Sequence, residues 1–339
     1  MARTRYASDP GLIARMGATM FLLGAVFVGL VVGLFYLFDI YSSRRGGGGS
    51  SGVGLAVLAG IIGIGAAFAS YYWSDKIALR TSGARLVGPD DSREAARLHA
   101  VVDRLCALAN MPKPKIAIAP TSMPNAFATG RSSKVAVLCA TQGLLDKLDD
   151  NEELEGVLAH EMSHVAHKDV AVMTVASVLG IIAALLVRFA FYGELFGGGD
   201  RGRGGGNNNN GGALPILLIV MVVGIVVYAV SFLLIRLLSR YRELSADRSG
   251  ALLTGRPSAL ASALVKVTGD MARIPTRDLR AAEPLNAFYF APAVKLTRGG
   301  GGGGGPSLSA LFSTHPSLER RLEELSKIQR QLGQQATPQ

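Results

Sequence analysis

Long stretches without charged side chains dominate the hydropathy pattern of this chain. Residues 17–38, 53–73 and 213–235 contain no charged side chain, and residues 170–190 contain only Arg188. As a helix, a run of about 20 residues is about 30 Å long, which matches the hydrocarbon core of a bilayer. The pattern therefore predicts four transmembrane helices, arranged as two hairpins.

Two polar stretches, residues 74–169 and 239–339, follow the two pairs of apolar runs. Several segments in them repeat apolar residues at helical spacing, and two short apolar segments bounded by turn residues indicate strands. The expected helices are residues 91–108, 142–148, 151–169, 240–253, 258–271 and 317–332, and the expected strands are residues 115–119 and 135–138. The predicted fold class is therefore mainly α with a small β-sheet.

These elements divide the chain into four parts. Residues 1–73 are expected to form an N-terminal transmembrane hairpin, and residues 170–238 a second one. Residues 74–169 and 239–339 are expected to form the two parts of one soluble domain. Three glycine-rich tracts cannot bury apolar area, and we interpret them as flexible linkers. They are residues 46–52, 197–212 and 299–305.

The composition narrows the class of protein further. The mean hydropathy is +0.31, 49% of the residues are hydrophobic and 18% are charged. The formal net charge is +10, but the basic residues form no stripe interleaved with aromatic residues, so nucleic acid is not an expected partner. Attraction to anionic lipid headgroups explains the positive charge better. Two cysteines, Cys106 and Cys139, are too few for a disulfide framework or a Cys-x-x-Cys zinc site.

The candidate chemistry lies in His160, Glu161 and His164, which have the spacing His-Glu-x-x-His. Two histidines four residues apart lie on one face of a helix, so both imidazoles can bind one zinc ion. Glu161 can act as a general base that activates a water molecule for attack on a carbonyl, and it can then protonate the leaving amine. The motif predicts a hydrolase with one Zn²⁺ per chain.

A zinc site of this kind needs a third protein ligand, and Glu243 is the candidate. It opens a Glu-x-x-x-Asp segment shortly after the last apolar run. Asp247, on the same helical face, can accept a hydrogen bond from a zinc-binding histidine. Because two apolar runs separate His164 from Glu243, two crossings would return the chain to the same side of the membrane.

The charges beside the apolar runs indicate which side this is. Ten basic residues flank the runs on the side of the candidate site and five on the opposite side, so the positive-inside rule favours a cytoplasmic site. The ten are Arg3, Arg5, Arg15, Lys76, Arg80, Arg85, Lys168, Arg236, Arg240 and Arg242, and the five are Arg44, Arg45, Arg188, Arg201 and Arg203.

The remaining histidines have weaker claims to a role. His315 lies in a Thr-His-Pro segment and is open to two interpretations. It could donate a hydrogen bond to the oxyanion of a tetrahedral intermediate, as a catalytic or substrate-positioning residue, or it could serve a cap or turn. His167 and His99 are interpreted as ordinary polar residues.

Taken together, these motifs resemble those of the HtpX family of membrane-bound zinc metalloproteases, which is related to the CAAX-prenyl endoproteases. The matching segments are residues 124–130 (Pro-Asn-Ala-Phe-Ala-Thr-Gly), 160–164, 239–247 and 314–316, with Arg321. The apolar runs follow the same order, so the resemblance covers nearly the whole chain. It implies a zincin-like cytoplasmic metallopeptidase domain on four membrane helices, with Glu243 as the third zinc ligand.

The resemblance also implies where the substrate binds and what is cleaved. The expected substrate-binding residues are Asn125, Val135, Ala136, Val137, Leu138 and Arg321. The strand among them would be an edge strand that pairs with an extended peptide, whereas Asn125 could instead be a turn residue after a proline. The implied activity is endoproteolysis of damaged or misfolded membrane proteins in a bacterial plasma membrane, with self-cleavage. The oligomeric state stays open.

Three other functions fit parts of the sequence. An intramembrane protease would bury the His-Glu-x-x-His motif in an apolar run, but residues 151–155 and 168–169 around it are largely polar or charged. A non-catalytic membrane scaffold would not need the base Glu161. A CAAX-type processing peptidase stays open as well, although four spans would form only a small chamber for a lipid-modified substrate.

Overall fold

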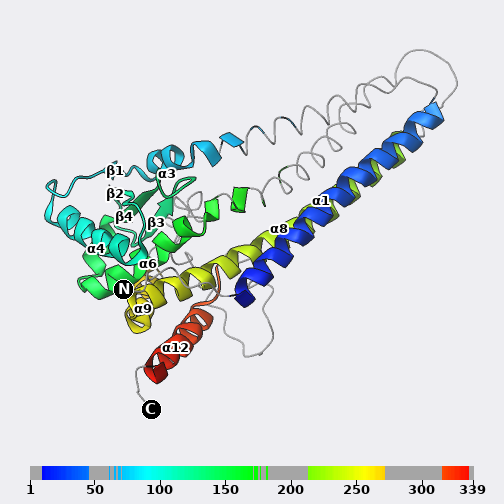
Figure 1. Ribbon diagram of the computed structural model, residues 1–339. Helices are drawn as coiled ribbons and strands as arrows, with labels where there is room; N and C mark the ends of the chain where they lie inside the picture. Colours follow the sequence, from blue (N-terminus) through cyan, green and yellow to red (C-terminus); the bar gives the residue numbers. More distant parts are fainter. Residues whose placement is uncertain are drawn as a thin grey trace. The chain divides into compact units, whose positions relative to one another are not determined.

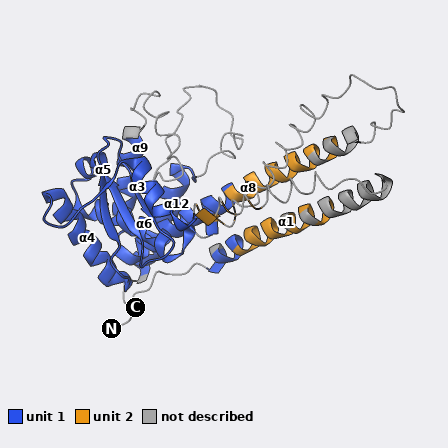
Figure 2. Ribbon diagram, turned by 90° about the horizontal axis from the view of Figure 1, so that it is seen from above, with its two compact units in different colours: residues 1–16, 70–172, 236–339 blue, residues 17–69, 173–235 orange. Residues whose placement is uncertain are grey.

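The computed structural model describes residues 10–45, 71–170, 213–271 and 315–335, with a few positions between 61 and 69 and between 172 and 181. The chain divides into two compact units, which Figure 2 shows in different colours. The first unit comprises residues 1–16, 70–172 and 236–339, and the second comprises residues 17–69 and 173–235. All the candidate site residues belong to the first unit.

Two long apolar helices supply the described part of the second unit. They are α1 (Pro10–Arg45) and α8 (Ala213–Thr254), which Figure 1 shows in blue and yellow-green. Within the described residues, both are long and apolar enough to cross a membrane, α1 over Ile13–Leu30 and α8 from Met221 onward. They overlap the first and the fourth predicted spans.

The other two predicted spans, residues 53–73 and 170–190, lie mostly outside the described residues, as do the glycine-rich tracts. Four transmembrane helices therefore stay a prediction.

A four-stranded mixed sheet organises the first unit. Its strands are β1 (Arg85–Leu86), β2 (Lys115–Ala119), β3 (Ala126–Thr129) and β4 (Val137–Thr141), in the order β1-β2-β4-β3. The strands β2 and β4 are parallel, whereas β1 is antiparallel to β2 and β3 is antiparallel to β4. The predicted small sheet in a mainly helical chain is confirmed.

The position of β4 corrects one expectation. The sequence predicts an edge strand over residues 135–138, but β4 begins at Val137 and lies inside the sheet, hydrogen-bonded to β2 and to β3. All its residues are buried, as is typical of an inner strand. Val137 and Leu138 therefore have no open edge for a peptide, and Val135 and Ala136 precede the strand. The edge strand on this side is β3, for which the sequence predicts no strand.

Helices surround this sheet in the first unit. They are α3 (Ser74–Ser82), α4 (Arg93–Ala109), α5 (Gln142–Lys147), α6 (Asn151–Ala166), α9 (Pro257–Met271) and α12 (Leu318–Gln335), together with the C-terminal part of α8. The helix predicted over residues 240–253 is not separate, because α8 continues through it from the apolar run. The prediction for α6 also extends too far, since Lys168 has a φ of 56° and turns the chain.

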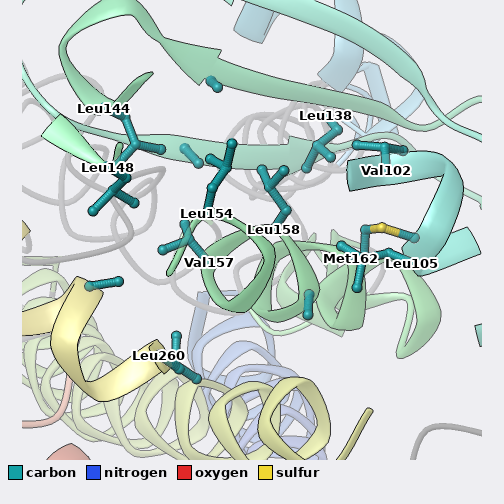
Figure 3. Packing of buried hydrophobic residues seen from close by; sticks show 14 of the residues in the cluster. Val102, Leu105, Leu138, Leu144, Leu148, Leu154, Val157, Leu158, Met162 and Leu260 are labelled. Carbon is teal, nitrogen blue, oxygen red and sulfur yellow. The ribbon is translucent and has the colours of Figure 1, made fainter. Parts of the chain in front are cut away.

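Helix α6 carries the His-Glu-x-x-His motif through the middle of the core. Asp150 caps its N-terminus by accepting a hydrogen bond from the Glu152 N–H at 2.8 Å, which satisfies a donor that the helix itself leaves open. Figure 3 shows Leu158 on the side of the sheet residue Leu138, and Leu260 of α9 on the far side of α6. The motif is thus held between the sheet and neighbouring helices, where its side chains have little freedom.

Candidate active site

Helix α6 presents His160 and His164 on one face. Their ring centroids are 4.9 Å apart, and the two Nε2 atoms are separated by 3.3 Å. His160 is fully buried, and the side chain of His164 is 13% exposed. The spacing of four residues therefore brings both imidazoles to one point, as the sequence predicts.

Helix α8 brings Glu243 to the same point. Its Oε2 lies 3.6 Å from His160 Nε2, and its Oε1 lies 3.6 Å from His164 Nε2. A glycine makes this approach of the two helices compatible with their backbones, because a Cβ at Gly250 would lie only 2.9 Å from the backbone nitrogen of His160. The C-terminal part of α8 can therefore approach the motif in α6 closely, because Gly250 has no side chain.

The three side chains fit a metal ion. One ligand atom from each lies within 4.8 Å of the others. For Zn–N and Zn–O bonds of about 2.0–2.2 Å, a tetrahedral site separates neighbouring donor atoms by about 3.3–3.6 Å. The two Nε2 atoms are 3.3 Å apart, and each lies 3.6 Å from a different oxygen of Glu243, so the three side chains enclose a space of about this size. Two imidazoles and one carboxylate are also a donor set that suits zinc.

On the side of His160, the structure places Asp247 and Arg321. Asp247 Oδ1 lies 2.9 Å from His160 Nδ1, the position predicted for it. Arg321 donates two hydrogen bonds to Asp247, from Nε at 2.7 Å and from a terminal nitrogen at 2.6 Å. Both side chains are 1% exposed. The predicted contact of Arg321 with substrate finds no support, because its guanidinium lies on a buried carboxylate beside the metal ligands.

On the side of His164, the structure reveals a residue that the sequence analysis missed. Asp169 Oδ2 lies 2.5 Å from His164 Nδ1, and Arg242 Nε lies 3.0 Å from the same oxygen. The spacing of five residues from His164 is not a helical pair, so helix geometry gave no reason to connect them. The one available signal was an acidic residue at the border of an apolar run.

Glu161 contacts the sheet and interacts electrostatically with both histidines. Its Oε2 accepts a hydrogen bond from the backbone N–H of Ala128 in β3 at 3.1 Å. Burial raises the pKa of this carboxyl above its ordinary value, although the two histidines oppose the shift. A raised pKa suits a general base that must later act as an acid. The backbone N–H of Ala128 is a second feature that the sequence analysis missed.

The last two predicted site residues occupy different surroundings. His315 Nδ1 lies 3.1 Å from Glu243 Oε2, and the residue is buried. Asn125 is also buried, and its backbone N–H donates to Thr141 Oγ1 at 2.8 Å. His315 thus lies beside a candidate metal ligand, whereas the backbone of Asn125 is hydrogen-bonded to the end of β4.

Comparison with known proteins identifies the family to which this site belongs. A family model described as "Peptidase family M48" matches residues 92–329, which include every residue of the site. The chain belongs to peptidase family M48.

Relatives named as HtpX protease homologues match nearly the whole chain. The chain is 52% identical over 339 residues to "Protease HtpX homolog 1" of Streptomyces coelicolor, with 99% of each chain covered. It is 46% identical over 333 residues to "Protease HtpX homolog" of Moorella thermoacetica, covering 97% of this chain and 98% of the relative. It is 44% identical over 331 residues to "Protease HtpX homolog 2" of Methanosarcina mazei, covering 98% and 100%.

A solved structure, "Crystal Structure of S. mikatae Ste24p", has a TM-score of 0.45 and 17% identity, and the match covers 94% of this chain and 66% of that one. A similarity of this size supports no further conclusion. The family model and the relatives are sufficient to confirm the predicted resemblance. This M48 protein is an HtpX-like membrane metalloprotease, and thus a hydrolase.

Proposed function

We propose that this M48 protein is a zinc-dependent endopeptidase that cleaves damaged or misfolded membrane proteins at the cytoplasmic face of a bacterial plasma membrane. The observation that carries the proposal is the position of Glu161. Its carboxyl lies beside the donor triangle of His160, His164 and Glu243 and also touches the edge strand β3. Base, metal ligands and peptide-binding edge therefore meet at one place.

His160, His164 and Glu243 would hold the zinc ion, since one ligand atom from each lies within 4.8 Å of the others. When bound, zinc supplies a Lewis acid that polarises the scissile carbonyl and acidifies water. Glu161 takes the proton of the attacking water and delivers it to the leaving amine nitrogen. The raised pKa of Glu161 supports the second of these transfers, because a carboxyl with a raised pKa takes up the proton more readily.

An extended substrate would pair with β3 rather than with β4. The N–H of Ala128 points away from β4, toward Glu161, so this edge of β3 faces the site. A peptide that adds to this edge would displace Glu161 from the N–H of Ala128 and run past the base and the metal ligands, and main-chain hydrogen bonds would hold it whatever its sequence. Such binding suits a protease that acts on many misfolded chains. We retain His315 as the donor to the oxyanion of the tetrahedral intermediate, a role that its place beside Glu243 supports.

Helix α8 supports a site close to a membrane surface. It continues from the apolar stretch that begins at Met221 directly to Glu243 without a break. Membrane-protein segments that emerge from the bilayer are therefore the substrates nearest to the site, and a second copy of this chain would be cleaved in the same way. The excess of basic residues on the flanks of the apolar runs supports the cytoplasmic side.

The proposal is tested with Glu161→Gln in the full-length, detergent-solubilised protein. We expect this variant to bind about one zinc ion, because the ligands are intact, and to lose at least about 100-fold in cleavage of casein or of an unfolded membrane protein. The matched control is Glu152→Gln on the same helix, since Glu152 is exposed and pairs with Arg256 on the surface.

Cleavage by Glu161→Gln at the rate of the control would remove Glu161 from the mechanism. Absence of zinc from the wild-type protein after loading would refute the metal site itself. Reporters inserted within residues 197–212 test the orientation. A reporter that is active only outside the cytoplasm should give a signal there, and a signal from a reporter that is active only in the cytoplasm contradicts the proposed topology.

A further inference from the structure

Asp169 is a buried charged residue that the proposed mechanism does not use. It is 2% exposed, and its Oδ2 lies 2.5 Å from His164 Nδ1 and 3.0 Å from Arg242 Nε. One carboxylate oxygen of Asp169 thus faces both an imidazole nitrogen and a guanidinium nitrogen.

The contact is made with the ring nitrogen that does not face the other donors. His164 points its Nε2 at His160 and Glu243, at 3.3 and 3.6 Å. A carboxylate at Nδ1 keeps the proton on that nitrogen, so that Nε2 carries the lone pair that a metal needs. The same contact fixes the rotation of the ring.

We propose that Asp169 is the positioning residue of His164 and that Arg242 holds Asp169 in place, so that the pair sets the strength of metal binding on this side of the site. This inference rests on the proposed function, because it concerns the same metal site. Asp169 itself does not touch the substrate or the reacting atoms, and it acts only through His164.

The path of the chain supports this role. Helix α6 ends at Ala166, and Lys168 adopts a φ of 56°. Residues other than glycine rarely adopt this backbone conformation. This turn brings Asp169 back toward His164, although the two residues are five apart and do not share a helical face. An uncommon backbone conformation next to a buried ion pair indicates that the local fold is arranged around this contact.

The partner of Asp169 adds a second connection. Arg242 precedes Glu243 in α8, so the ion pair joins the end of α6 to the helix that supplies the third ligand. Asp169 also directly precedes the apolar run of residues 170–190. The pair therefore fixes the distance between two ligand-bearing helices at the point where the chain enters that run.

The test is the zinc affinity of Asp169→Asn in the full-length protein, measured by competition with a chromogenic chelator. We expect affinity to fall about 10–100-fold, the usual loss when the carboxylate partner of a metal-binding histidine is removed. Asp169→Glu restores the charge and should recover part of this loss. The matched control is Asp103→Asn, because Asp103 is exposed and pairs with Lys113 at the protein surface.

A merely structural role predicts a different result. The metal-free Asp169→Asn protein would then melt at a lower temperature, while its folded molecules bound zinc as tightly as the control; that outcome overturns the inference. If Asp169→Asn does not fold, Arg242→Gln takes its place, with an expected loss of several-fold in zinc affinity. Unchanged affinity in a folded Arg242→Gln protein likewise overturns it. If the wild type and the control bind no zinc, the proposed function fails instead.

Discussion

The two histidines of the candidate metal site are supported by the same chemistry but by different parts of the chain. Each imidazole contacts a carboxylate through Nδ1, and each carboxylate contacts an arginine. The Asp247 set comprises His160, Asp247 and Arg321, and the Asp169 set comprises His164, Asp169 and Arg242. Regular helices supply all of the Asp247 set, whereas the Asp169 set depends on a turn after α6.

The two sets differ in burial and in the number of contacts. Asp247 and Arg321 are each 1% exposed and joined by two hydrogen bonds, whereas Arg242 is 13% exposed and contacts Asp169 through Nε. A buried charge without a partner is costly, so removing one member of a fully buried pair lowers the free energy of unfolding strongly. We therefore expect the Asp247 set chiefly to stabilise the fold and the Asp169 set chiefly to tune the metal ligand.

The largest effect is expected from Arg321→Met. This change keeps much of the side-chain volume but leaves the carboxylate of Asp247 buried without its cation, which costs about 3–5 kcal/mol. Arg242→Met should cost less, because water can reach the more exposed Asp169 set. Thermal unfolding of the two detergent-solubilised variants, both free of metal, measures the comparison. Equal losses of stability would show that the sets do not differ as proposed.

A smaller effect than that of Arg321→Met is expected on how stability depends on pH. It concerns the contact of His160 with Asp247. Burial alone lowers the pKa of His160, but the hydrogen bond and the charge of Asp247 outweigh burial and raise this pKa to about 9. A raised pKa contributes stability that is fully present below the unfolded pKa of about 6.5 and is lost as pH rises through about 9. The metal-free protein should therefore lose this contribution between these two pH values.

Asp247→Asn should remove most of that pH dependence, since Asp247 causes the shift. Thermal unfolding from pH 6 to 10 in the presence of a chelator measures it, with Asp103→Asn as the matched control. Zinc-loaded protein should not show the same loss, because an imidazole is neutral as long as it binds the metal. A pH profile of Asp247→Asn identical to that of the control would remove Asp247 as the cause.

The two sets also show how far the sequence could predict this site. Glu243 and Asp247 are four apart in a helix, so their shared face followed from helical periodicity alone. Asp169 could not be found in this way, because its contact depends on the positive φ of Lys168. Neither this conformation nor the ion pair with Arg242 is visible in the spacing of residues.

The strands teach the same lesson for the fold. The sequence predicts a sheet because β2 and β4 are short apolar runs, but it places β4 at the edge. Which strand lies outside depends on pairing between distant segments, and β3 consists of four residues, Ala126–Thr129, with little pattern of their own. Local periodicity therefore predicts most of the helices. The pairing of distant strands decides which strand contacts the base Glu161.

The smallest expected effect comes from exchanging each arginine for lysine. Lysine carries a single nitrogen and cannot reproduce the two parallel hydrogen bonds that Arg321 donates to Asp247. It can replace one ion-pair contact, such as that of Arg242 with Asp169, so Arg242→Lys should cost little stability. Arg321→Lys should cost clearly more than this, yet less than Arg321→Met, because the charge is kept. If Arg242→Lys proved as costly as Arg321→Lys, the guanidinium of Arg242 would have to act as a two-pronged donor, and the proposed contrast between the two sets would be wrong.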